Sequence, residues 1–122
     1  MIKVLVVDDE AAITDFLCNF LKRFDIASEK ATKGATAIDL FKEIKPDWVF
    51  LDLKIPDMDG FEVLKALKKI DPNAKVIMIT GSGEKESQVK AKKLGALDYI
   101  IKPLDLEDLH QKIQTHILGK NQ

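Results

Sequence analysis

Four short apolar runs in the sequence each end on a polar side chain, and this pattern limits the folds that the chain can adopt. The runs span residues 4–7, 49–51, 76–79 and 99–101. In that order they lead into Asp8 with Asp9, Asp52, Thr80 and Lys102. Short runs rich in Val and Ile, separated by longer helical patterns, are typical of buried parallel strands. The chain is therefore predicted to adopt an α/β fold with a parallel sheet.

The segments between these runs have the periodicity of amphipathic helices. Apolar residues recur at three- and four-residue steps over 13–24, and similar patterns predict helices at 34–45, 61–70, 85–94 and 106–117. Residues 26–31 alternate apolar and polar side chains, as a half-exposed edge strand does. The helix over 85–94 has only Val89, Ala91 and Leu94 on its apolar side. We expect it to be the least firmly packed helix.

Strands that alternate with helices predict a three-layer sandwich, because right-handed crossovers place helices on both faces of a parallel sheet. The apolar character of four strands puts them inside the sheet, and the strand at 26–31 belongs at an edge. A flavodoxin-like (βα)5 fold with strand order 2-1-3-4-5 meets both conditions. In that order the strands ending at Asp8, Asp9 and Asp52 are neighbours, so the three carboxylates should lie side by side.

Composition limits the size of the fold and its partners. The 122 residues are 46% hydrophobic, which suits one domain over residues 1–118 with a short polar tail at 119–122. The formal net charge is −1, with both signs interspersed, so no nucleic-acid surface is predicted. The apolar stretches are too short to span a bilayer and no signal peptide is evident, so we expect a cytoplasmic protein.

The polar residues at the strand ends suit phosphate chemistry. Clustered carboxylates repel one another, and a bound cation such as magnesium, which often bridges to phosphate, relieves the repulsion. The Lys102 ammonium and the Thr80 hydroxyl can stabilise phosphoryl oxygens. A carboxylate can also act as the nucleophile. Asp52 is the best candidate because it stands alone, whereas Asp8 and Asp9 are paired as metal ligands would be.

Several of these residue patterns also have purely structural explanations. Taken alone, the acidic residues 8–10 fit a negative cluster favoured by the dipole of the helix that follows. Cys18 fits a small core residue better than a nucleophile. His110 and His116 lie on different faces of the last helix, which excludes a helical metal pair, and both are expected to be exposed. The lysines within 85–93 indicate a solvated face.

Four segments carry a more specific pattern. They are residues 6–10 (VVDDE), 52–60 (DLKIPDMDG), 80–81 (TG) and 95–103 (GALDYIIKP). Together they closely resemble the receiver domain of bacterial two-component response regulators, and the resemblance extends from the first strand to the last helix. A lone acidic pair or a lone Lys-Pro would be a weak signal, but the combination is specific.

The resemblance implies that Asp52 accepts a phosphoryl group from a phosphohistidine on a sensor kinase or histidine phosphotransfer protein. It also implies a magnesium ion bound by Asp8, Asp9, Asp52 and the backbone carbonyl of Lys54, with Asp9 a more direct ligand than Asp8. Lys102 would pair with the phosphate, and the Lys102-Pro103 peptide bond is expected to be cis.

The resemblance further implies a switch. Thr80 would move toward the phosphate and the Tyr99 ring would turn inward behind it. This would reshape the surface formed by residues 85–94, 98–102 and 106–117, where a downstream partner or a second copy of the chain is expected to bind. The glycine-rich residues 81–83 should be mobile without phosphate. Such a domain is not an enzyme in the usual sense, since it assists only its own phosphorylation and dephosphorylation.

A magnesium-dependent phosphohydrolase with an aspartyl-phosphate intermediate is the alternative. Enzymes similar to haloacid dehalogenases carry the nucleophile and an acid-base Asp two residues apart after the first strand. Here the first strand ends in the adjacent Asp8 and Asp9, and the candidate nucleophile Asp52 follows the third strand. No segment predicts a cap domain over a substrate. The sequence therefore favours signalling, with output through the receiver surface or through a further domain.

Overall fold

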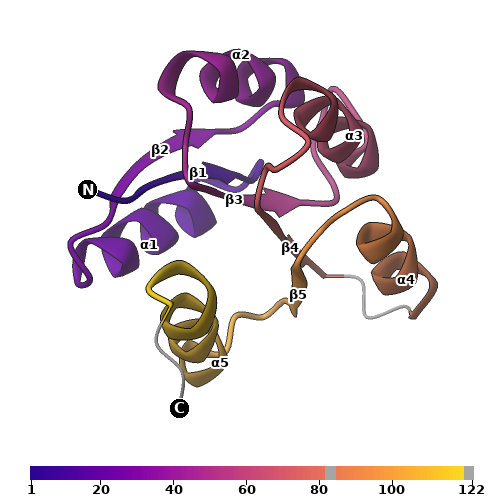
Figure 1. Ribbon diagram of the computed structural model, residues 1–122. Helices are drawn as coiled ribbons and strands as arrows, with labels where there is room; N and C mark the ends of the chain where they lie inside the picture. Colours follow the sequence, from indigo (N-terminus) through magenta and orange to yellow (C-terminus); the bar gives the residue numbers. More distant parts are fainter. Residues whose placement is uncertain (82–84, 120–122) are drawn as a thin grey trace.

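The computed structural model describes residues 1–81 and 85–119, in which a parallel sheet lies between two layers of helices (Figure 1). The strands are β1 (Lys3–Val7), β2 (Ala27–Ala31), β3 (Trp48–Asp52), β4 (Val76–Thr80) and β5 (Asp98–Ile101). They pair in the order β2-β1-β3-β4-β5, and every pair is parallel. The predicted fold class and strand order are confirmed.

The helices follow the strands in regular alternation. They are α1 (Ala11–Lys22), α2 (Gly34–Ile44), α3 (Gly60–Ile70), α4 (Lys85–Lys93) and α5 (Leu106–Lys112). The sequence predicts one last helix through residue 117, but α5 passes into a wider π-helical turn at Ile113–Ile117, labelled η1. The Leu118 N–H donates to the Ile113 carbonyl at 2.9 Å, which is the i to i+5 bond that defines such a turn.

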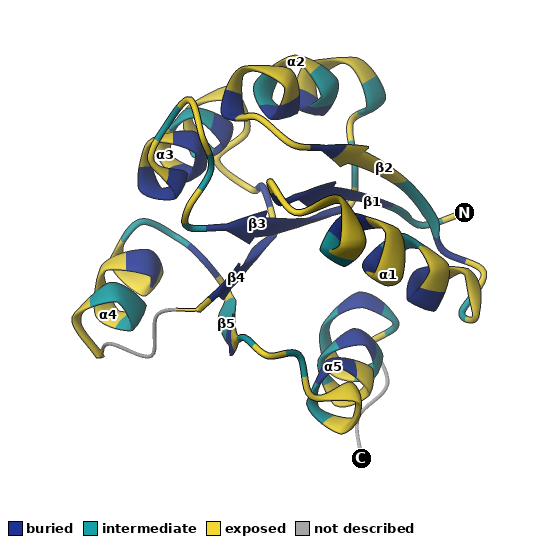
Figure 2. Cartoon of the chain, turned by 180° about the vertical axis from the view of Figure 1, so that it is seen from behind, coloured by how far each residue is buried: buried dark blue, intermediate teal, exposed yellow. Residues whose placement is uncertain are grey.

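Each face of the sheet has its own hydrophobic core, because successive side chains of a strand point to opposite faces. Leu5, Val49 and Met78 are buried on the face covered by α2, α3 and α4. Val6 and Phe50 are buried on the other face, where they pack with residues of α1 and α5. Figure 2 shows β3 and β4 as buried along their whole length, whereas β2 is partly exposed. β2 is therefore the edge strand that its alternating sequence predicts.

Helix α4 is less apolar on its inner side than the sequence indicates. Ala91 is buried and Leu94 is half-buried, but Val89 is 44% exposed. The prediction that Val89 faces the core is wrong, because the short helix packs through Ala91. Ser82 and Gly83 of the expected mobile loop, and residues 120–122 of the expected tail, lie outside the described residues.

Contacts at the amino-terminal ends of the strands correct the prediction that both histidines are exposed. His110 is exposed as expected, but His116 is half-buried, and its Nε2 lies 2.8 Å from Asp98 Oδ2. The His116 ring also lies 5.7 Å from the Trp48 ring, between centroids. Asp98 at the start of β5 and the buried Trp48 ring thus hold the His116 side chain against the sheet. Within residues 1–81 and 85–119, no helix has the length and apolar character needed to cross a membrane.

We expect Gly60→Ala to destabilise the protein by about 2 to 3 kcal/mol, the usual cost of forcing an extra carbon into a packed site. A Cβ atom at Gly60 would lie 2.5 Å from Leu53 Cα and 2.6 Å from the Asp52 carbonyl oxygen. Backbone atoms cannot give way as the end of a side chain can. Urea unfolding followed by Trp48 fluorescence measures the effect.

Gly81→Ala is the matched control, because a Cβ atom at Gly81 would meet nothing within 4 Å. We expect this change to alter the free energy of unfolding by less than about 1 kcal/mol. Equal destabilisation by the two substitutions would contradict the close approach of Gly60 to the end of β3.

Candidate functional site

The parallel sheet brings polar side chains to its carboxyl edge, at the point where the strand order reverses. Asp8 follows β1, Asp52 ends β3 and Thr80 ends β4, and these residues are 2%, 4% and 0% exposed, respectively. Charged and hydroxyl side chains are seldom so deeply buried unless they are paired. The predicted convergence of Asp8, Asp52 and Thr80 in this region is therefore present, and ligands of such sheets bind at this edge.

Lys102 joins the buried carboxylates. Its Nζ atom lies 2.8 Å from Asp8 Oδ2 and 3.2 Å from Asp52 Oδ2. Burial alone lowers the pKa of Lys102, but Asp8 and Asp52 outweigh it and the pKa is raised, so the ammonium is charged at neutral pH. The Lys102-Pro103 peptide bond is cis, as the resemblance implies.

The ionised form of Asp52 remains electrostatically unfavourable in spite of its contact with Lys102. Burial and the nearby charge of Asp8 raise the pKa of Asp52, and they outweigh the Lys54 N–H and the Lys102 ammonium, which favour the charged form. The Lys54 N–H donates to Asp52 Oδ1 at 3.2 Å. Two buried carboxylates thus share one ammonium, so an additional cation would be stabilised here.

Three carboxylates at the mouth of this pocket fit such a cation. Oxygen atoms of Asp8, Asp9 and Glu10 lie within 4.8 Å of one another, and Asp9 and Glu10 are exposed. Asp8 Oδ2 is buried against the Lys102 ammonium, which Asp52 and Glu10 share, so its charge is only partly balanced. Hard oxygen donors, few in number and open to water on one side, suit magnesium. The residues present therefore fit this ion.

Glu10 also belongs to the site, although its position in the sequence by itself predicts no role in phosphate chemistry. Its Oε1 atom lies 3.4 Å from Lys102 Nζ. Its backbone N–H donates to Asp8 Oδ1 at 2.9 Å. Its place directly after the acidic pair is the only sequence signal for this role, and the same signal also fits a helix start.

The residues expected to form the switch lie on adjacent strands. Thr80 is fully buried at the end of β4, and Tyr99 is half-buried in β5. In the β4–β5 register Thr80 is opposite Ile101, while Tyr99 is opposite Met78. Thr80 and Tyr99 are thus close in the sheet, with Thr80 nearer the acidic pocket along the strand direction.

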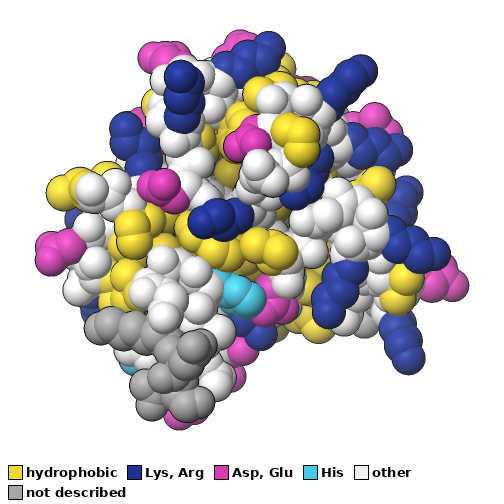
Figure 3. All heavy atoms as spheres, in the orientation of Figure 1, with side chains coloured by type: hydrophobic (Ala, Val, Ile, Leu, Met, Phe, Trp, Pro, Cys, Tyr) yellow, Lys and Arg dark blue, Asp and Glu magenta, His cyan; other side chains and the backbone are white. Residues whose placement is uncertain are grey.

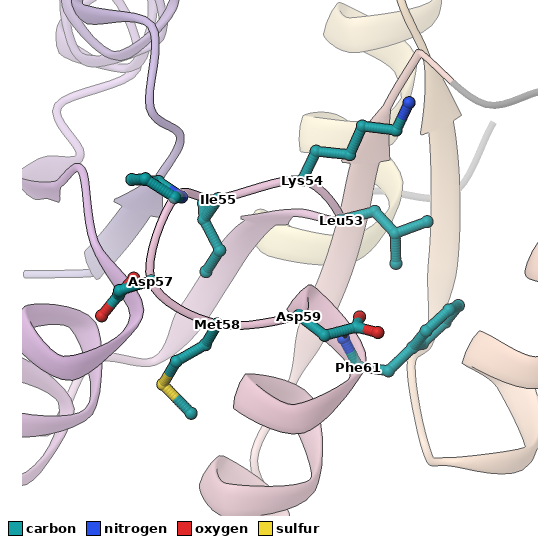
Figure 4. A pocket seen from close by; sticks show the side chains of 8 residues that line it. Leu53, Lys54, Ile55, Asp57, Met58, Asp59 and Phe61 are labelled. Atoms are coloured by element: carbon teal, nitrogen blue, oxygen red, sulfur yellow. Dashed lines mark hydrogen bonds between the residues drawn. The ribbon is translucent and has the colours of Figure 1, made fainter.

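The loop after β3 lines a hollow of its own (Figure 4). This hollow has a volume of about 590 Å³ and is lined by Leu53, Phe61 and the loop residues between them. Lys54 forms an antiparallel bridge with Asp59, and the Gly60 N–H donates to the Leu53 carbonyl at 2.8 Å. Asp59 also caps α3, because its side chain accepts from the Phe61 N–H at 2.9 Å. The segment that carries the Lys54 carbonyl is therefore held in a turn by bonds between its two ends.

Comparison with known families matches residues 4–114 to the response regulator receiver domain. The chain belongs to this family. It is 36% identical over 115 residues to sporulation initiation phosphotransferase F of Bacillus subtilis, a match that covers 94% of this chain and 93% of that protein. It is also 40% identical over 103 residues to the chemotaxis protein CheY of Thermotoga maritima, covering 83% and 85% of the two chains.

A solved structure extends the comparison to the three-dimensional fold. The CheX-CheY-BeF3-Mg complex of Borrelia burgdorferi contains a chain that is 31% identical and superimposes with a TM-score of 0.88. The match covers 95% of this chain and 89% of that one. The protein is thus a phosphoacceptor domain of two-component signalling, and the alternative of a phosphohydrolase is not favoured.

We expect Asp52→Asn to stabilise the magnesium-free protein at pH 7 by about 1 kcal/mol, a common gain when a strained functional group is removed. The folded state of the wild type holds the Asp52 proton more tightly than the unfolded chain does, because the pKa is raised on folding. At pH 7, where Asp52 is ionised, the wild type therefore has a lower free energy of unfolding than the variant. As the pH falls from the raised pKa to below the ordinary value of 3.8, Asp52 becomes protonated in both the folded and the unfolded state. The difference in stability between the wild type and the variant should then disappear.

Thermal unfolding between pH 7 and pH 3.5 in the presence of a chelator tests this expectation. Asp39→Asn removes an equally charged but exposed carboxylate from α2 and should change little. A variant at Asp52 that is less stable than the wild type at pH 7 would show that the Lys102 ion pair outweighs the burial of the charge.

Proposed function

We propose that Asp52 accepts a phosphoryl group from a phosphohistidine on a sensor kinase or histidine phosphotransfer protein. The observation that carries this proposal is the buried Asp52 carboxylate with its raised pKa, in contact with Lys102 at the carboxyl edge of the sheet. Family membership supports it, since the relatives include a protein named as a phosphotransferase.

In the proposed reaction an Asp52 carboxylate oxygen attacks phosphorus. The bond from phosphorus to the donor imidazole nitrogen breaks, and its electron pair returns to the imidazole. Lys102 is 3.2 Å from Asp52 Oδ2, so it can move its contact to a phosphoryl oxygen without leaving the pocket. The buried Thr80 hydroxyl at the end of β4 is the proposed donor to a second oxygen.

We assign the magnesium ligands to Asp9, Asp8, Asp52 and the backbone carbonyl of Lys54. The fit rests on the cluster formed by Asp8 and Asp9 and on the excess of negative charge, since the buried Asp8 and Asp52 carboxylates share the Lys102 ammonium. Asp9 is assigned as the more direct ligand because it is exposed, whereas Asp8 is buried against Lys102. When bound, magnesium supplies positive charge that offsets the carboxylates and the incoming phosphoryl group.

We further propose that phosphorylation alters the surface of α4, β5 and α5 through Thr80 and Tyr99. This surface exposes large apolar side chains: Val89 on α4, Leu97 before β5, Ile101 on β5 and Leu106 on α5 are 44%, 48%, 43% and 53% exposed. Figure 3 shows lysine side chains around apolar ones over α4. A downstream protein or a second copy of the chain is the proposed occupant.

The proposal predicts one phosphoryl group on Asp52. Incubation with acetyl phosphate and magnesium should raise the mass of the intact protein by one phosphoryl group, and Asp52→Asn should gain none, because an amide is not a nucleophile of this kind. A chelator should stop labelling of the wild type. Peptide mapping after hydroxylamine treatment locates the acceptor.

Asp39→Asn is the control, since this exposed α2 carboxylate lies outside the pocket, and it should be labelled like the wild type. Equal labelling of Asp52→Asn would refute the assignment of Asp52. Steady turnover of p-nitrophenyl phosphate by the wild type would instead favour the phosphohydrolase.

The switch predicts that effects of phosphate reach beyond the pocket. With beryllofluoride as the phosphoryl mimic, amide NMR shifts should change at Thr80, along α4 to Leu94 and around Tyr99. The middle of α2 should stay unchanged. Thr80→Ala should leave Asp52 able to gain phosphate but suppress the changes in α4, because the hydroxyl that follows the phosphate is absent.

Thr36→Ala, an exposed threonine on α2, serves as the control and should behave like the wild type. Changes confined to the carboxyl edge of the sheet in the wild type would show that the chain stores phosphate without this switch.

A further inference from the structure

Helix α2 begins without a cap of its own. Lys33, at the N-cap position, makes no side-chain cap hydrogen bond, and the first turn contains no acidic residue. The N–H groups at the start of a helix need acceptors from elsewhere. The Gly34 N–H donates to Asp57 Oδ1 at 2.7 Å, and the Ala35 N–H donates to Asp57 Oδ2 at 3.0 Å. Both oxygens of one distant carboxylate therefore cap α2.

The charge of Asp57 suits this position. The backbone N–H groups of Ala35 and Gly34 lower the pKa of Asp57, because they bind its ionised form. The partial positive charge of a helix N-terminus favours a carboxylate in the same way. Asp57 is thus ionised and doubly bonded at neutral pH, although it is exposed.

The contact ties α2 to the loop that follows the phosphoacceptor strand. In Figure 4, Asp57 lies on the side of the loop that faces the neighbouring helix, and Met58 extends from the adjoining position. A Cβ atom at Gly34 would lie 2.7 Å from Met58 Sδ, so the glycine permits this close approach. The loop and the start of α2 are therefore packed together as well as hydrogen-bonded.

The same loop is fixed to the site at its other end. The Lys54 N–H donates to Asp52 Oδ1, and Lys54 is bridged to Asp59. Lys54 thus lies in a short segment held at Asp52 on one side and at Asp57 on the other. Loss of the Asp57 contact would leave the Lys54–Asp59 bridge in place but remove the bonds to α2, so the backbone that carries the Lys54 carbonyl would be held less firmly.

We propose that Asp57 is a positioning residue for the phosphorylation site: by capping α2 from the loop, it holds the Lys54 carbonyl in place for magnesium. This proposal rests on the function proposed above for Asp52 and Lys54. Asp57 itself touches neither the metal nor the phosphoryl group. It acts through the backbone of residues 54–57.

Magnesium titration of the unphosphorylated protein, followed by amide NMR shifts, tests the proposal. Asp57→Ala should weaken magnesium binding roughly tenfold, at the lower end of the effects seen for residues that orient metal ligands. The amide hydrogens of Gly34 and Ala35 should exchange faster with solvent. Asp57→Asn keeps one acceptor oxygen and should give an intermediate magnesium affinity.

A second variant separates positioning from simple weakening of α2. Lys42→Gly replaces an exposed residue in the last turn of α2, far from the Asp57 contact at the first turn. It lowers helix stability because glycine is a poor helix former, and it leaves the Asp57 contact intact. It should lower the midpoint of thermal unfolding but leave the magnesium affinity unchanged. An equal loss of affinity in Lys42→Gly and Asp57→Ala would overturn the proposal.

Wild-type magnesium affinity in Asp57→Ala, together with faster exchange at Gly34 and Ala35, would also overturn it, because Asp57 would then be a helix cap alone. Failure of the function proposed for Asp52 looks different. In that case the wild type itself gains no phosphoryl group on Asp52, whatever residue stands at position 57.

Discussion

The contact of one ammonium with two buried carboxylates is the interaction on which the site depends. Lys102 lies 2.8 Å from Asp8 and 3.2 Å from Asp52, in a pocket where both carboxylates are almost fully buried. One positive charge cannot balance two negative charges and the exposed acidic residues beside them, so the pKa of Asp52 is raised by burial and by Asp8. This imbalance makes the pocket attractive to a cation. It also costs stability, as is common where function requires charged groups in a low-dielectric setting.

The direction of the strands explains why sequence alone predicts most of this arrangement. In a parallel sheet every strand ends at the same edge, so a residue that follows an apolar run is placed there whatever its distance along the chain. Asp8, Asp52, Thr80 and Lys102 satisfy that rule, and the apolar runs themselves are strong signals for buried strands. The strand order required one further step, the assignment of the alternating segment 26–31 to an edge. The observed β2 has that character.

Contacts between loops and helices could not be predicted from the sequence pattern. Glu10 reaches Lys102 from the start of α1, and Asp57 caps α2 from a loop more than twenty residues away. Neither partner can be identified before the fold has brought the two segments together. Val89 and His116 show the reverse case, in which the expected exposure of a residue on a predicted helix is wrong. A short helix can pack through one small residue, Ala91, and His116 is half-buried because the fold brings Asp98 and Trp48 beside it.

Differences in packing around the sheet also indicate which helix could move in the proposed switch. α3 is held to the end of β3 by Gly60, whose N–H donates to the Leu53 carbonyl and whose Cα leaves no space for a side chain. α2 is bonded to the same loop through Asp57. By contrast, Ala91 is the one residue of α4 that is buried, and several large apolar side chains around α4 and β5 face solvent. In the proposed switch, a change at Thr80 would therefore shift α4 more easily than α2 or α3, because α4 is the less firmly packed helix.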